Sequence, residues 1–252
     1  KPDVVAPGTD ILSCRSSSAP AGRFWGLDPA HPTYGYMGGT SMAAPLVAGC
    51  AALVRQYFEQ QRQHAPSAAL LRATLVNGTR WLTGQHSNAT NPPGGVVPEG
   101  NFDQGFGRID MPATLPHPGN PDLVLAFEDN WQAPGDQLAS TGDRRRWVAE
   151  VASASLPLRI CLAYTDLPAR ALQYNLNLFV QAPDGTKYLG NQQLRLGLKI
   201  PDTDNNVEVL RIAAPAPGRY LIQITAQNLL KTPQDFALVV TGHLTTDQLT
   251  PA

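Results

Sequence analysis

A proline-rich stretch over residues 112–121 divides the sequence into two parts with different hydrophobic patterns. Proline and glycine end helices and strands, so such a stretch favours a connection between folded units. Loops and two helical patterns precede it, whereas short apolar runs separated by turn residues follow it. We therefore expect part of an α/β unit over residues 1–115, a linker over 116–121, an all-β unit over 122–245 and a tail over 246–252.

Two segments of the first part have the pattern of helices. One begins near Ser41 and continues to about Gln61, with Ala, Leu and Val dominating its first half. We expect Pro45 in its first turn, where the missing backbone N–H costs little. The second helix is expected over about Ser67 to Val76, because Asn77-Gly78 is a good C-terminal signal.

The second part has the pattern of an antiparallel β structure. Asp184-Gly185 and Pro217-Gly218 are turn signals between apolar runs, and the first predicts a hairpin. Many short strands without a long helix predict an antiparallel sandwich or jelly roll. The clearest expected strands cover residues 147–151, 158–164, 176–180, 207–212, 219–225 and 236–240.

Composition excludes several classes of function. The 252 residues carry a formal net charge of -1, which argues against electrostatic binding of nucleic acid. No uninterrupted apolar stretch is long enough to span a bilayer, so no membrane partner is expected. Cys14, Cys50 and Cys161 allow at most one disulfide and lack the spacing of metal ligands. The run Asp143–Arg146 predicts an exposed charged turn before a strand.

The segment Gly38-Gly39-Thr40-Ser41, just before the alanine-rich helix, has the residue types of a nucleophile site. A nucleophilic serine needs an exposed hydroxyl, and glycines beside it let a substrate backbone approach closely. At a helix N-terminus, unpaired N–H groups and the positive end of the macrodipole stabilise an oxyanion. The same residues also fit an ordinary helix start in which Thr40 or Ser41 is the N-cap.

The segment Gly39-Thr-Ser-Met-Ala-Ala-Pro45 matches the nucleophile signature of the subtilisin-like serine proteases residue for residue. Upstream, Lys1 to Gly8 and Asp10 to Ser13 resemble the strand and loop that precede this signature. Downstream, Gly105 to Asp110 resembles the segment that closes the catalytic domain. The resemblance covers about residues 1–115 and implies a remnant of a doubly wound α/β subtilase (peptidase S8) domain.

The resemblance implies a serine endopeptidase in which Ser41 forms the acyl-enzyme. It also implies that Met37, Gly38, Gly39 and Thr40 bind substrate, in a loop from Tyr34 to Gly39 that lines the cleft. No cofactor is required for this catalysis. The triad of this family follows the chain order Asp, His, Ser, so only the serine falls within this sequence. Without a positioned base a serine hydroxyl is a poor nucleophile, and we expect the isolated chain to be inactive.

The five histidines do not lie in the His-Gly-Thr setting of the family's base. We interpret them as ordinary surface or loop residues, with His31 near the motif as the one alternative base. They are His31, His64, His86, His117 and His243.

Residues 120–245 resemble the C-terminal β-domain that is appended to some bacterial alkaline subtilases. The resemblance rests on residues 162–166, 175–185, 188–191, 204–208 and 236–240. Relatives are often Asp-rich where this chain has Asn175 and Asn177, which puts a calcium role there in doubt. Asp202, Asp204 and Glu208 suit either a structural calcium ion or a solvated turn, and we expect the turn.

The chain opens without an initiator methionine or a leader pattern, and we interpret it as a fragment or processed product. Family resemblance implies a secreted or periplasmic protein acting on protein or peptide substrates. The strand at Val4 to Ala6 would be buried on both faces of a complete fold. Its expected partner is therefore the missing N-terminal part of the same protease or a self-associated copy.

Two other functions are compatible with the sequence. One is a non-catalytic β-sandwich module that binds or stabilises, joined to a degenerate protease remnant. The other is an unrelated serine hydrolase that uses His31 as its base.

Overall fold

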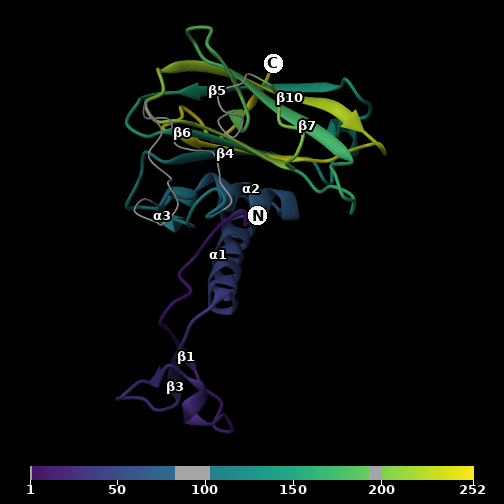
Figure 1. The fold of residues 1–252 in the computed structure, drawn as a ribbon. Coiled ribbons are helices and arrows are strands. Elements are labelled where there is room, and N and C mark those ends of the chain that lie inside the picture. The colour runs from purple at the N-terminus through teal and green to yellow at the C-terminus, as the bar shows by residue number, and fades with distance from the viewer. Residues whose placement is uncertain (1, 83–102, 193–199) are drawn as a thin grey trace.

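The computed structural model describes residues 2–82, 103–192 and 200–252. Figure 1 shows two packed β-sheets at one end of the molecule, with helix α2 lying under them. Helix α1 extends away from the sheets, and a small sheet lies at its far end. The first part of the chain is therefore elongated, and only one end of it is in contact with the β structure.

The small sheet contains three short antiparallel strands in the order β1-β3-β2. Their bounds are Ile11–Cys14 for β1, Gly26–Leu27 for β2 and Tyr34–Met37 for β3, and the 3-10 helix η1 covers Ala21–Arg23. The expected loop from Tyr34 to Gly39 is thus mostly the central strand β3. Within the described residues the only parallel pairing is the bridge between Val5 and Arg108, so these residues do not form a doubly wound parallel sheet among themselves.

Three α-helices follow in the part of the chain that the structure describes, and the first two agree with the sequence pattern within one residue at each end. Helix α1 covers Thr40–Gln61, α2 covers Ala68–Asn77 and the short α3 covers Met111–Thr114 at the start of the proline-rich stretch. Ser67 caps α2, because its side chain accepts a hydrogen bond from the Leu70 N–H at 2.9 Å. Pro45 lies inside α1, beyond the first turn where it was expected. Its missing N–H leaves the Ser41 carbonyl without the usual i+4 donor.

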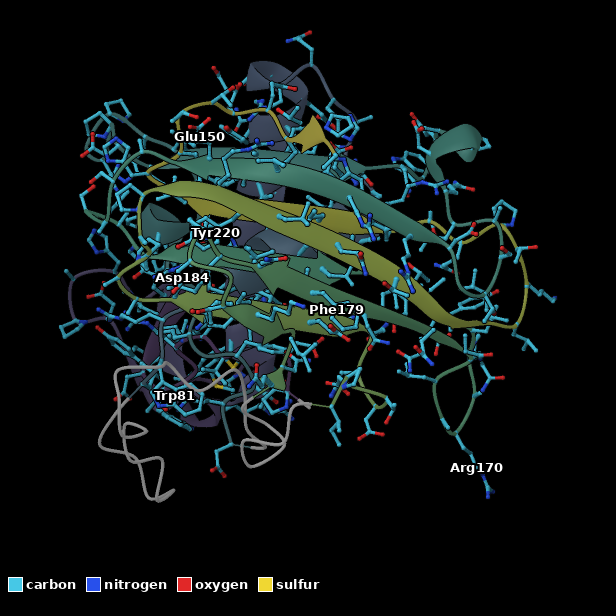
Figure 2. All side chains as sticks on the ribbon, turned by 90° about the horizontal axis from the view of Figure 1, so that it is seen from above. Trp81, Glu150, Arg170, Phe179, Asp184 and Tyr220 are labelled. Atoms are coloured by element: carbon cyan, nitrogen blue, oxygen red, sulfur yellow. The ribbon has the colours of Figure 1, made fainter. Side chains whose placement is uncertain are left out.

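The second part of the chain forms two antiparallel sheets, seen from above in Figure 2. Every expected strand is present, and Asp184-Gly185 forms the turn between β7 and β8, with Gly185 at φ 85°. The five-stranded sheet β12-β5-β10-β7-β8 consists of Thr250–Pro251, Arg144–Val151, Gly218–Leu229, Tyr174–Gln181 and Lys187–Leu189. The four-stranded sheet β4-β11-β6-β9 consists of Val124–Asp129, Ala237–Gly242, Leu158–Ala163 and Val207–Ile212, and a 3-10 helix, η2, covers Pro134–Asp136.

The two sheets share one apolar core, and the helices share a second core with the outer face of the four-stranded sheet. Strand residues alternate between the cores because successive side chains point to opposite faces. In β6, for example, Ile160 faces the inter-sheet core and Cys161 faces the helices. Phe58 of α1 and Leu70 of α2 are completely buried in the helix-side core.

Polar contacts hold the same interface. Arg62 donates to the Leu125 carbonyl at 2.8 Å, and its guanidinium lies 5.0 Å from the centre of the Phe127 ring. Arg211 of β9 is buried and donates to the Val76 carbonyl in the last turn of α2 at 3.0 Å, where a cation is favourable. Arg72 reaches Asp3 and Asn206, each at 3.0 Å, and so joins the start of the chain to the β structure through α2.

The core between the helices and the four-stranded sheet predicts that two apolar residues of α1 differ in their contribution to the unfolding free energy. Phe58 is fully buried, with its ring centre 4.9 Å from that of Phe127, whereas Leu53 is 53% exposed. Phe58→Ala is expected to lower the unfolding free energy by about 3–5 kcal/mol, because it removes buried area and leaves a cavity. Leu53→Ala is the matched control and is expected to change it by less than about 0.5 kcal/mol. Urea unfolding of the chain measures both, and equal effects would contradict this account of the interface.

A second prediction concerns Glu128 of β4. Burial, together with the nearby Asp136 carboxylate, raises the pKa of Glu128 from 4.5 to about 7. The folded chain therefore holds this proton more tightly than the unfolded chain, and the resulting stabilisation is complete below pH 4.5 and is lost as the pH rises towards about 7. Above that pH the charged carboxylate destabilises the fold.

Glu128→Gln removes the titration without changing the shape of the side chain. Relative to the unsubstituted chain, its unfolding free energy should rise by about 1–2 kcal/mol between mildly acid and mildly alkaline pH, a range reduced for solvent screening of a partly exposed group. Urea unfolding across that pH range measures the difference. Parallel pH profiles of the two chains would show that Glu128 titrates normally.

Candidate active site

Ser41 lies at the N-terminus of α1, and its side chain is exposed. The residue that caps the helix is Gly39, whose backbone has φ 141°, and no side chain caps this end. Thr40 and Ser41 are the first two helical residues, so the alternative in which one of them is the N-cap is wrong. The hydroxyl of Ser41 is therefore not occupied in starting the helix.

The first turn of α1 also presents unpaired donors. The N–H groups of Met42 and Ala43 bond to the Gly39 carbonyl at 3.0 and 3.4 Å. The N–H groups of Thr40 and Ser41 precede the first helical hydrogen bond, and neither is bonded to another described residue. These N–H groups and the helix dipole favour negative charge beside Ser41. An oxyanion formed on a substrate carbonyl would gain from this arrangement.

The three sequence segments that resemble subtilases come together in the fold. The Gly39 N–H donates to the Gly8 carbonyl at 2.6 Å, which fixes the chain just before the helix. A Cβ at Gly8 would lie 2.9 Å from the Gly39 oxygen, so this contact requires glycine. Further back, Val5 donates to the Gly107 carbonyl at 3.0 Å and accepts from the Ile109 N–H at 3.2 Å.

An aromatic ring lies beside the residues that precede the serine. Met37 ends strand β3, and the indole of Trp25 lies against Gly38, where an added Cβ would overlap the ring. Trp25 itself is 60% exposed. The glycine that would admit a substrate backbone is therefore covered by an aromatic ring from the neighbouring segment.

No base is paired with Ser41 in the described part of the chain. The described histidines bond elsewhere, and His86 lies outside the described residues. His31, the alternative base, has Nδ1 3.4 Å from the Asp28 carboxylate and packs edge-on against Tyr34. Hydrogen bonds, chiefly from the Ala30 N–H, lower the pKa of Asp28.

A serine, a histidine and an aspartate do meet elsewhere, which the sequence did not indicate. Ser155 Oγ lies 2.8 Å from His243 Nδ1, and Asp122 Oδ2 lies 3.9 Å from the same nitrogen. A catalytic triad needs the serine and the carboxylate on opposite ring nitrogens. Here both approach Nδ1, so this trio lacks the geometry for general-base catalysis.

His64 lies in the loop between α1 and α2, in agreement with its interpretation as a surface or loop residue. It also makes a contact that this interpretation did not include, because its Nε2 lies 2.9 Å from the fully buried Asp129 carboxylate. Its ring also packs against Phe58 and Phe127. Only a known pairing of the α1–α2 connection with β4 would have revealed this contact, since 65 residues separate the two partners.

The acidic segment of the β unit is not the solvated turn that was expected. Asp202 and Glu208 are only 2% and 1% exposed, although Asp204 is exposed. Asn191 and Asn205 each donate a side-chain amide to Asp202 Oδ2 at 2.8 Å, and Leu178 donates its N–H to Glu208 at 2.7 Å. Among the described residues no group of three metal-ligating side chains is found.

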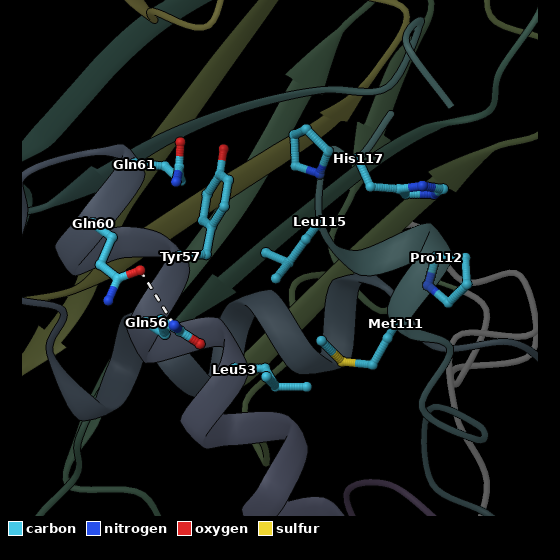
Figure 3. A pocket seen from close by; sticks show the side chains of 10 residues that line it. Leu53, Gln56, Tyr57, Gln60, Gln61, Met111, Pro112, Leu115 and His117 are labelled. Carbon is cyan, nitrogen blue, oxygen red and sulfur yellow. Dashed lines mark hydrogen bonds between the residues drawn. The ribbon is translucent and has the colours of Figure 1, made fainter. Parts of the chain in front are cut away.

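A groove of about 470 Å³ lies between α1 and α3, as Figure 3 shows. Leu53, Tyr57 and Met111 give it an apolar floor, and Gln56 donates to Gln60 at 3.2 Å along one side. His117 lies at the other side. None of residues 34–41 lines it, so it is separate from the nucleophile motif.

Comparison with known proteins places the similarity where the motifs lie. Residues 1–107 match the model of the subtilase family, peptidase S8. The serine protease/ABC transporter B family protein tagB of Dictyostelium discoideum is 26% identical over 96% of this chain. The subtilisin-like proteases SBT2.2 and SBT2.3 of Arabidopsis thaliana are 37% and 35% identical over 51% of it.

The chain spans only a small share of these relatives, 15% of tagB and 14% of SBT2.2. The similarity to subtilases therefore lies in residues 1–107, which include the segment 39–45. The helices of the described segments are too short or too polar to cross a bilayer.

Two glycines, one at the N-cap of α1 and one inside the helix, test how the motif is held. Gly39 has a positive φ that side chains rarely adopt, whereas Gly49 lies within the helix with open space around an added Cβ. Gly39→Ala should lower the unfolding free energy by about 1–3 kcal/mol, because alanine is strained there. Gly49→Ala should raise it by about 0.5–1 kcal/mol through helix propensity. Urea unfolding gives both values, and a neutral Gly39→Ala would mean that the helix start is not fixed in this conformation.

Proposed function

We propose that this chain is the nucleophile-bearing part of a serine endopeptidase and that Ser41 attacks the peptide carbonyl to form an acyl-enzyme. The observation that carries the proposal is the exposed Ser41 hydroxyl at a helix N-terminus, inside the stretch that matches the subtilase model. An exposed nucleophile beside free N–H groups supplies two of the requirements for acyl transfer. The third, a base, has to come from outside the described residues.

The mechanism divides between this chain and the segment that completes it. A histidine from the completing segment takes the Ser41 proton as the bond to the carbonyl carbon forms, and returns it to the leaving amine. An aspartate from the same segment orients that histidine. The Ser41 N–H stabilises the oxyanion, and water then releases the acyl group.

Met37, Gly38, Gly39 and Thr40 are proposed to bind the substrate backbone on the approach to Ser41. Their place at the end of β3 and the start of α1 supports this role. The Trp25 ring, which lies against Gly38, would have to move aside for a substrate to reach the glycine. We propose that completion of the domain displaces this ring.

The missing segment is proposed to be the preceding part of the same protein, with self-association as the alternative. Exposed apolar residues support this. Leu46, in the outer half of α1, is 41% exposed, and Val4 and Val5 near the start of the chain are only half-buried. Leu12 and Tyr34 of the small sheet are each 43% exposed. These apolar surfaces would be covered by the strands and helices of a complete domain.

The β unit has a supporting role in this proposal. We assign its two sheets to a sandwich of the jelly-roll type over residues 122–245, and its shared core with α1 and α2 supports a bracing function. Catalysis by Ser41 needs no cofactor, and a calcium ion would be structural. Secretion or export to the periplasm is part of the proposal and rests on the resemblance to subtilases, as does a protein or peptide substrate.

A fluorophosphonate probe tests the proposal directly. In the complete protein it should label Ser41, and Ser41→Ala should abolish both labelling and peptide hydrolysis. Ser155→Ala is the matched control, because Ser155 is the serine that contacts a histidine in this chain. The 252-residue chain alone should remain unlabelled, since its serine lacks a base.

The competing functions give different labelling patterns. No labelling of either protein would favour a non-catalytic module with a degenerate protease remnant. Labelling of the chain alone that is lost on His31→Ala would favour a hydrolase with a local base. Either pattern overturns the proposal.

A further inference from the structure

The outer face of the five-stranded sheet carries several cationic side chains at its outward strand positions. It is the face turned away from the helices, and Figure 2 looks onto it. The run Asp143–Arg146 does not form the exposed turn that was expected, because strand β5 begins at Arg144. Arg144 and Arg146 therefore stand on this face and not in a loop.

Strand register places four exposed cations on this face. Residues paired directly in an antiparallel sheet point to the same side. Arg146 pairs with Gln223 and Arg144 with Thr225, and Arg219 belongs to the same outward row of β10. Lys187 of β8 pairs with Gln181 on the same side. Glu150, opposite Arg219, is the only acidic residue at the outward strand positions.

Four cations against one anion contrast with a chain whose formal net charge is -1. No ion pair joins Arg144, Arg146, Arg219 or Lys187 to a carboxylate in the described part of the chain. Arg146 is held in place by a 2.7 Å hydrogen bond from its Nε to Gln223 Oε1, which leaves its terminal nitrogens available. Glu150 lies opposite Arg219, and the outward strand positions keep a net positive charge because no carboxylate lies opposite the other three cations.

Apolar side chains occupy the centre of the same face. Leu221 pairs with Val148, and Phe179 pairs with Leu189, in neighbouring rows. All four are partly exposed, and each is flanked by polar or basic residues of the next row. We call this surface, the four cations and these four apolar residues, the basic face.

We propose that the basic face binds an acidic segment of a protein substrate, whose carboxylates meet Arg146 and Arg219 while its apolar side chains pack on Leu221 and Phe179. A basic rim around an apolar centre is complementary to a polypeptide that carries both acidic and apolar residues. Single-stranded nucleic acid fits less well, because it needs several aromatic rings on which bases stack, and Phe179 is the one aromatic residue at the outward strand positions.

The identity of the occupant as a substrate rests on the proposed protease function, but the binding itself does not require Ser41. Failure of the two proposals is therefore distinguishable. Probe labelling tests the nucleophile, and peptide binding by the chain carrying Ser41→Ala tests the basic face. Binding should be unchanged by that substitution.

The experiment measures fluorescence anisotropy of a labelled short peptide in which pairs of glutamates alternate with pairs of leucines, so that each side of the extended peptide carries both residue types. The 252-residue chain should bind it, and a peptide with glutamine in place of glutamate should bind much more weakly. The double substitution Arg146→Gln and Arg219→Gln should weaken binding about tenfold, since it removes two exposed ion pairs. Raising the salt concentration should weaken binding by the unsubstituted chain and have less effect on the variant.

The matched control is the double substitution Arg23→Gln and Arg55→Gln. Both residues are exposed on the first part of the chain, and the net charge changes by the same amount. Phe179→Ala tests the apolar centre and should weaken binding several-fold at all salt concentrations. A thermal melt of each variant checks that the sheets remain folded.

Two results would overturn the proposal. One is equal binding by the Arg146/Arg219 and Arg23/Arg55 variants, which would indicate non-specific charge attraction. The other is binding of a single-stranded oligonucleotide of the same charge as tightly as the acidic peptide, which would make the face a general polyanion surface. Weakening confined to the Arg146/Arg219 and Phe179 variants, together with preference for the peptide, supports it.

Discussion

The contact between α2 and the four-stranded sheet is the interaction on which the rest of the structure depends. Leu70 and Ala73 of α2 are fully buried against Cys161 and Val239 of the sheet, and Phe58 extends the same core into α1. The two parts of the chain are consequently packed against each other and are not independent domains joined only by a linker. The proline-rich connection joins units that already share a hydrophobic core, and Arg72 and Arg211 add polar contacts across it.

The division of α1 into an anchored end and a projecting end follows from this contact. Its C-terminal half packs on the sheet through Phe58, while its N-terminal half projects away from the sheets with Leu46 exposed. Tertiary packing supplies most of the stability of helices in proteins. The N-terminal half of α1 gains little of it, because its apolar residues are not packed against the sheets. The nucleophile motif is thus carried by the end of the helix that the rest of this chain supports least.

Local chemistry allowed much of the fold to be predicted, and long-range pairing accounts for what could not be. The bounds of α1 and α2 could be predicted because composition, Ser67 and Asn77-Gly78 act over a few residues. Asp184-Gly185 likewise predicted its hairpin from turn preference alone. Other features depend on more than local sequence. The position of Pro45 within α1 depends on where the helix starts, whereas the His64–Asp129 contact and the burial of Asp202 depend on partners distant in sequence.

The buried carboxylates of the β unit, Asp202 and Glu208, are surrounded by hydrogen-bond donors. Asp202 and Glu208 are both removed from solvent, and buried charges need compensation by a cation or by hydrogen-bond donors. Here donors supply it, since amides of Asn191 and Asn205 and the Leu178 N–H point at the carboxylate oxygens. Asn177 lies in the same pocket, and with its nitrogen turned towards them it donates to the Asp202 carbonyl at 2.9 Å and to Glu208 at 3.1 Å. An aspartate at position 177 could accept from a cation but donate to neither group. The Asn177 amide therefore joins the segments of Asp202 and Glu208 through hydrogen bonds that an aspartate could not donate.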